Sequence, residues 1–235
     1  MLRLAVALGL IVAIALPLSA ARPADALIVL RVTPPSTADR LYASAPLRFV
    51  LLKSGQFYVG GTTTMAKGLL DDRARKDLEK RMKKVLKLKG VGAEVRLGPG
   101  ETRYELMLGE KKPRTFVTLG DPAKAPAALR ELGSLVAALA AFDHASIRPY
   151  VPRRFALSAR VGELPGGCRS WTFARSLDAV LETASIVSAN AARGWPWGAA
   201  AASVCQEGEH YVVNLRPLVP GESWPPGLPS RPSTN

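Results

Sequence analysis

Histidine is the side chain that general acid–base catalysis uses most often, and this 235-residue chain has two, His144 and His210. His144 follows Asp143 directly and lies two residues before Ser146, so the three residue types of a hydrolytic triad stand together. Neighbouring side chains cannot easily aim at one shared hydrogen bond, so we expect His144 to bind backbone carbonyls at a helix end. One hypothesis, a small exported enzyme, requires His144 or His210 to work with nearby acids.

Three common catalytic motifs do not occur: the G-x-S-x-G elbow, the H-E-x-x-H pair and the G-x-x-x-x-G-K-[ST] phosphate loop. Segment 60–67 has paired glycines and a lysine but lacks the Gly-Lys pair, and we expect it to be a loop that enters a helix. The sequence therefore predicts no catalytic residues and no cofactor. Our leading hypothesis is a non-catalytic binding or structural domain.

Cys168 and Cys205 are the two cysteines of the chain. Outside the cytoplasm such a pair forms a disulfide, and closing the loop between them stabilises a fold by about 4 kcal/mol in the chain-entropy model. A zinc site is the alternative, because cysteine and histidine are suitable ligands, but no two candidate ligands are closely spaced along the chain. We expect the disulfide and no metal.

The N-terminus predicts export. Arg3 is followed by an almost unbroken apolar run over 4–18, and then by small residues at 19–21. The run is shorter than the roughly twenty residues that span a bilayer, so a cleaved signal peptide is favoured over an anchor. Cleavage after Ala21 is preferred, and cleavage after Ala26 is the alternative. The mature protein would be periplasmic or extracellular.

The charge balance is strongly basic, with 32 Lys and Arg against 19 Asp and Glu and a formal net charge of +13. Removal of the signal peptide takes away only Arg3, so the mature protein stays basic. An exported protein of this charge can attract an anionic polymer, a membrane surface with acidic head groups or an acidic partner protein, with nucleic acid less accessible. The alternative is that the charge serves solubility alone.

Two segments gather this charge. The amphipathic segment 69–89 has nine basic side chains against four acidic ones, which predicts a core-packing helix with a basic solvent face. The second candidate is a set of arginines and aromatic rings suited to phosphate, sulfate or uronate groups, and it comes together only if two loops meet. Packing of the aromatic rings into a core is the other interpretation of this set. Its members are Arg148, Tyr150, Arg153, Arg154, Arg169 and Trp171.

Hydrophobic periodicity predicts an α+β fold with a mainly antiparallel sheet and about three packed helices. The helices are expected over 69–89, in a segment after Pro126, and from a Ser176 cap to Gly194. Strands are expected over 27–32 (as an edge strand), 47–52, 56–59, 93–97, 103–108, 115–119, 155–161, around 204, and over 211–215. Glycine turns are expected to join 47–52 to 56–59, and 93–97 to 103–108.

The domain organisation predicted is simple. Residues 1–21 form the signal peptide, 27–216 a single α+β domain, and 217–235 a tail that contains six prolines. A strand–helix–strand order occurs in both 48–97 and 154–215, but scattered identity and the lack of a fixed period argue against a sequence repeat.

Overall fold

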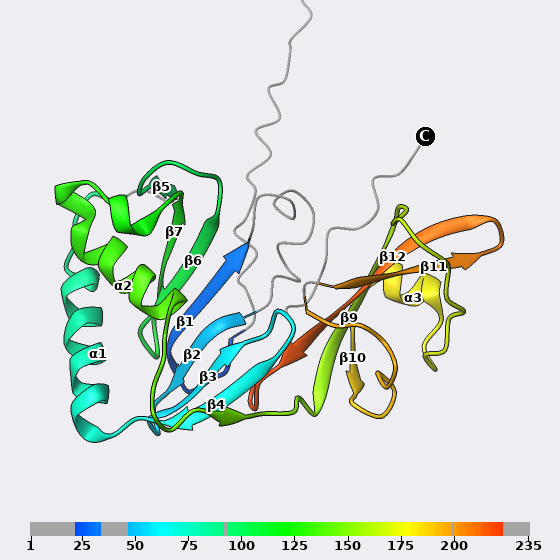
Figure 1. Cartoon of the computed structure of the whole chain (residues 1–235), viewed down its shortest axis with the longest axis horizontal. Coiled ribbons are helices and arrows are strands. Elements are labelled where there is room, and N and C mark those ends of the chain that lie inside the picture. Colours follow the sequence, from blue (N-terminus) through cyan, green and yellow to red (C-terminus); the bar gives the residue numbers. More distant parts are fainter. Residues whose placement is uncertain (1–21, 34–46, 92–93, 199, 223–235) are drawn as a thin grey trace, which may run out of the picture.

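The structure, a computed structural model, describes residues 22–33, 47–91, 94–198 and 200–222 (Figure 1). The predicted signal peptide lies outside these residues, and so does the predicted tail beyond residue 222. The described chain is of mixed α and β structure with mostly antiparallel sheets and three α-helices, so the predicted α+β class is confirmed.

The first sheet has eight strands in the order β5-β7-β6-β1-β2-β3-β4-β8. All neighbours are antiparallel except β5 and β7, which are parallel. The strands are β1 (Ala26–Thr33), β2 (Leu47–Leu52), β3 (Gln56–Gly60), β4 (Met65–Leu69), β5 (Glu94–Arg96), β6 (Arg103–Leu108), β7 (Arg114–Leu119) and β8 (Arg148–Pro149).

Two helices, α1 (Asp72–Leu86) and α2 (Arg130–Ala140), cover one face of this sheet (Figure 1). Two 3₁₀ turns, Pro122–Lys124 and Ala127–Leu129, lead into α2. Strands alternate their side chains between faces, so β1 places Ile28 and Leu30 under the helices. Leu78 and Val85 of α1 join them in the main apolar core.

The second sheet has the order β10-β9-β12-β11 and is antiparallel throughout. Its strands are β9 (Arg154–Val161), β10 (Ser185–Ser188), β11 (Ala201–Gln206) and β12 (Glu209–Leu218). The short helix α3 (Leu177–Glu182) covers one face together with an aromatic group. In that group Phe173 lies between Trp171 and Trp195, with ring centroids 5.0 and 4.7 Å away.

A third apolar cluster joins the two sheets. Val29, Val50 and Met107, on the face of the first sheet away from its helices, pack with Val219, which follows β12. Two buried ion pairs accompany this cluster: Arg31–Glu105 at 3.6 Å and Arg216–Glu222 at 2.5 Å. Burial lowers the pKa of the Arg31 guanidinium, and the neighbouring Glu105 opposes that shift. Residues up to 222 are therefore part of the fold, although the sequence placed 217–222 in the tail.

Several predicted elements differ from those observed. Strand β1 is central, between β2 and β6, and not an edge strand. Segment 60–67 does not lead into a helix, because β4 begins at Met65 and pairs with β3. Strand β5 does not pair with β6, since β7 lies between them.

The third helix is much shorter than predicted. Ser176 caps it as expected, with its hydroxyl accepting from the Ala179 N–H at 3.4 Å, but α3 ends at Glu182. The chain then forms β10, which pairs with β9. Ile186 and Val187 are β-branched and fit a strand better than a helix, and pairing with β9 decides between the two. The two halves of the chain also differ in topology, so they are not structural repeats.

Candidate functional site

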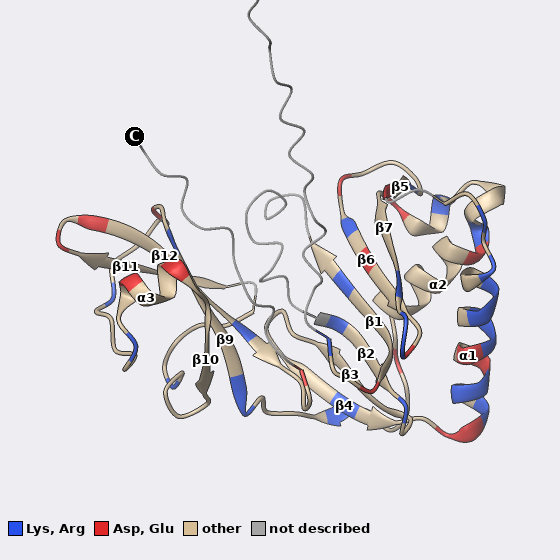
Figure 2. Cartoon of the chain, turned by 180° about the vertical axis from the view of Figure 1, so that it is seen from behind, with Lys and Arg blue, Asp and Glu red and all other residues tan. Residues whose placement is uncertain are grey.

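Helix α1 presents a row of positive charge to solvent. Asp71 caps the helix by accepting from the Ala74 N–H at 2.8 Å, and Leu78, Met82 and Val85 fix its buried side. Five exposed basic side chains recur every three or four residues on the opposite side, and we call them the basic stripe: Arg73, Lys76, Lys80, Lys83 and Lys87. Figure 2 shows the Lys and Arg positions along this helix at the outer border of the molecule.

The other cations of α1 are already paired. Arg75 lies 3.7 Å from both Asp72 and Glu79, and Lys84 lies 3.2 Å from Glu131 of α2. Arg81 donates to the backbone carbonyl of Ser134 at 2.9 Å. By contrast, the stripe residues have no hydrogen bond or ion pair to any of the residues that the structure describes. Their charge is therefore available to an outside anion.

The stripe is long and narrow. At about 1.5 Å of rise per residue, the fourteen-residue step from Arg73 to Lys87 covers about 21 Å. The helical spacing keeps the five side chains on one line. Acidic residues border this line at helical spacing: Asp77 lies four residues after Arg73 and three before Lys80, Glu79 lies three after Lys76 and four before Lys83, and Asp72 lies four before Lys76. The exposed charge therefore extends along the helix and does not converge on one point.

The predicted set of arginines and aromatic rings is divided by the fold. Arg148 lies in β8, opposite Lys67 of β4. Tyr150 packs edge-to-face on Tyr58 at 5.1 Å, with the Lys67 ammonium 5.4 Å from its ring. Burial raises the pKa of the Tyr150 hydroxyl, and the charge of nearby Arg153 opposes that shift.

The remaining members lie along the second sheet. Arg154 begins β9 and donates to the backbone carbonyl of Glu222 at 3.4 Å. Arg169 is beside Val204, which the strand register places at the level of the far end of β9, about 23 Å along the strand. Trp171 packs into the aromatic group and donates to the Arg175 carbonyl at 2.8 Å. The register thus separates Arg154 from Arg169.

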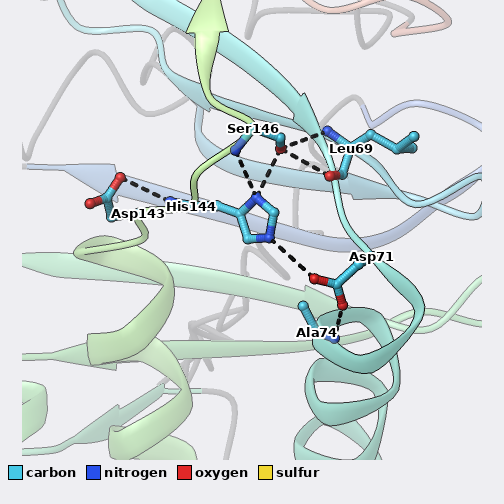
Figure 3. Close-up of polar contacts among 6 residues, drawn as sticks. All are labelled: Leu69, Asp71, Ala74, Asp143, His144 and Ser146. Atoms are coloured by element: carbon cyan, nitrogen blue, oxygen red, sulfur yellow. Dashed lines mark hydrogen bonds and ion pairs between the residues drawn. The ribbon is translucent and has the colours of Figure 1, made fainter.

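His144 belongs to a polar cluster between three elements (Figure 3). The Ser146 hydroxyl accepts from the Leu69 N–H at 3.1 Å and donates to the Leu69 carbonyl at 2.9 Å. His144 Nδ1 lies 2.8 Å from the same hydroxyl and accepts from the Ser146 N–H at 3.2 Å. On the other side of the ring, Nε2 lies 3.9 Å from Asp71, the residue that caps α1.

These contacts fit a structural link between chain segments better than a catalytic nucleophile and its base. We call this link, formed by His144 and Ser146 with Leu69 and Asp71, the staple. The Ser146 hydroxyl already contacts both backbone groups of Leu69, and Gly68 is so close that a Cβ there would lie 2.6 Å from it. A tetrahedral reaction centre needs open space beside the hydroxyl. The cluster instead connects the end of β4 and the start of α1 to the segment after α2, and so positions the basic stripe. Sequence reasoning missed Asp71 as the neighbour of His144, because the two lie far apart in the chain.

Cys168 and Cys205 form a disulfide with their Cα atoms 5.4 Å apart, as the sequence predicts. His210, the second candidate base, lies directly opposite Cys205 in the β11–β12 hairpin. Within the described part of the chain, the hydrogen-bonding contacts of its ring are these sulfur atoms.

None of the helices in the described ranges has the length and apolar character needed to cross a bilayer. No known protein family, curated protein sequence or solved structure matches this chain.

Proposed function

We propose that this protein is an exported, non-catalytic domain that binds a linear anionic polymer along the basic stripe of α1. The observation that carries the proposal is the row of five exposed basic side chains, aligned on one helix face and without partners among the described residues.

The composition of the stripe favours a polymer over a small anion. Four of its five members are lysines, whose compact and strongly hydrated charge does not impose the planar, bidentate geometry of arginine. A row of such charges suits repeated sulfate, phosphate or carboxylate groups and discriminates little between them. In an exported protein, an acidic polysaccharide is the polymer class that best fits this description.

The stripe itself is wholly charged, so a membrane is the weaker candidate. A helix that lies on a bilayer inserts an apolar face, often with Trp or Phe. The apolar face of α1 is occupied by the core, where Leu78 is 6% exposed and Val85 is fully buried.

The contacts of residues 22–26 favour cleavage of the proposed signal peptide after Ala21 over cleavage after Ala26. Arg22 donates to the carbonyls of Gly109 and Glu110, Pro23 bridges Glu222, and Ala26 is fully buried in β1. Cleavage after Ala26 would remove these contacts, whereas cleavage after Ala21 keeps them. The disulfide agrees with an oxidising compartment.

Salt dependence tests the proposal. Five charge contacts, at the roughly 0.7 counterions released per contact for a flexible polyanion, predict an about 100-fold loss of heparin affinity between 50 and 200 mM salt. The measurement is the dissociation constant of the mature protein for heparin across that range, with anionic and zwitterionic liposomes in parallel. No heparin binding at low salt, an affinity that salt leaves unchanged, or tighter binding to anionic liposomes would contradict the proposal.

A further inference from the structure

Three metal-ligating side chains meet at the end of the second sheet where the β11–β12 hairpin turns, far from α1. The β11–β12 hairpin turns through Glu207 and Gly208 and sets Cys205 opposite His210. The loop before α3 passes beside β11, where Arg169 pairs with Val204, and this brings Cys168 to the same place. The ligand atoms of Cys168, Cys205 and His210 all lie within 4.8 Å of one another.

The two distances from the imidazole to the sulfur atoms are close to the edges of a metal tetrahedron. Zinc–ligand bonds of about 2.0–2.3 Å place neighbouring ligand atoms about 3.5 Å apart. His210 Nδ1 lies 3.4 Å from the Cys205 sulfur and 3.9 Å from the Cys168 sulfur. The two Cα atoms are 5.4 Å apart, so the sulfurs can separate from a bond to such a distance by side-chain rotation alone.

The imidazole has no competing role in the described structure. Among the described residues, its hydrogen-bonding contacts are the two sulfur atoms. His210 and Cys168 are exposed and Cys205 is partly exposed, so water can reach the cluster. Ser203, on the same face of β11 as Cys205, has its hydroxyl 4.0 Å from the Cys168 sulfur.

We propose that the reduced protein binds one thiophilic divalent cation, such as Zn²⁺, through Cys168, Cys205 and His210, and that the disulfide closes this site. A dithiol reductant gives two electrons and two protons to the disulfide, becomes a disulfide itself, and leaves two thiols. The cation then displaces both thiol protons and binds two thiolates and the neutral imidazole, with water as the fourth ligand. Oxidation by a disulfide oxidant returns the cysteine pair and releases the cation. The site is independent of the function proposed for α1.

The test uses the mature protein, reduced by a dithiol that is then removed under anaerobic conditions. Co²⁺ is the first probe, because thiolate ligation gives charge-transfer absorption and a tetrahedral site gives intense visible bands. Zn²⁺ affinity follows from competition with a chromogenic chelator. The reduced protein should bind one equivalent, the oxidised protein should bind none, and His210→Ala should weaken binding at least about tenfold.

Glu209→Gln is the matched control, since Glu209 is an exposed residue of the same hairpin and should not be a ligand. Its affinity should equal that of the unaltered reduced protein. Circular dichroism shows whether the reduced chain is folded. The proposal is overturned by equal binding in the oxidised protein, by full affinity in His210→Ala, by absence of binding to the reduced protein, or by a reduced chain that binds only when unfolded.

Discussion

At the scale of single residues, Gly68 is the position that the staple around His144 depends on most. A Cβ at this position would overlap the Phe57 ring and lie 2.6 Å from the Ser146 hydroxyl. Only glycine leaves room for the Phe57 ring and the Ser146 hydroxyl to contact β4 at this position. The staple in turn holds the start of α1.

Gly68→Ala should lower the free energy of unfolding by about 1–3 kcal/mol, because the added methyl group overpacks this contact. Gly167→Ala is the matched control: no atom lies within 4 Å of the place that its added methyl group would take, and its φ is not left-handed. That control should change stability by less than about 0.5 kcal/mol. Urea unfolding measures both, and equal stability of the two variants would show that the staple is not tightly packed.

Single residues of the candidate sites are brought together by contacts that the sequence alone does not reveal. The types of Cys168, Cys205 and His210 were evident, but their meeting depends on the β11–β12 hairpin, which periodicity did not identify. The Glu207-Gly208 turn between Cys205 and His210 is the signal that could have found it. Asp71 and His144 gave no such signal, since only the tertiary packing of α1 against the segment after α2 brings them together.

At the scale of elements, local signals explain most of the fold. The regular apolar spacing of α1 predicts a helix, and the glycine turn predicts the hairpin of β2 and β3, but the predicted helix over 69–89 includes Asp71, which is the N-cap. Strand β4 was missed because glycines and threonines precede it, and α3 was predicted too long because its apolar spacing continues into β10. In both segments, strand pairing outweighs local preference.

The disulfide gives the element-scale prediction. It ties the loop before α3 to β11, across a separation of 37 residues. Reduction should lower the free energy of unfolding by about 4 kcal/mol, because the unfolded chain regains the entropy of the open loop. Urea unfolding with and without reductant measures this, and a Cys168→Ser, Cys205→Ser double variant should match the reduced protein and ignore reductant. An unchanged midpoint on reduction would contradict the prediction.

At the scale of the whole molecule, the two sheets share a boundary that should make them unfold together. The third apolar cluster contains residues from both sides of this boundary. Gly198, which precedes β11, lies so close to the loop between β3 and β4 that a Cβ there would overlap the Thr62 carbonyl oxygen. Trp171 and Trp195 pack in the core of the second sheet, whereas α1 and α2, the two longer helices, belong to the first sheet. Tryptophan fluorescence therefore reports mainly on the second sheet, and helical circular dichroism mainly on the first.

The two signals should give coincident urea transitions in the unaltered protein. Gly198→Ala should separate them or lower both midpoints, because it forces the boundary apart and strains a left-handed residue at φ +75°. Separate transitions in the unaltered protein would mean that the sheets are independent folding units.

The proposed function requires that the position of charge on α1, and not the net charge of the molecule, determines polyanion binding. The most direct measurement compares two variants with the same change in net charge. One carries Lys76→Gln, Lys80→Gln and Lys83→Gln in the stripe, and the other carries Lys111→Gln, Lys112→Gln and Lys124→Gln at exposed positions elsewhere.

The stripe variant should lose heparin affinity, and its slope of log affinity against log salt should become shallower by about 2, or roughly 0.7 for each lysine removed. The second variant should keep the slope of the unaltered protein. Equal losses in both variants would show that net charge alone is responsible and would contradict the proposed function.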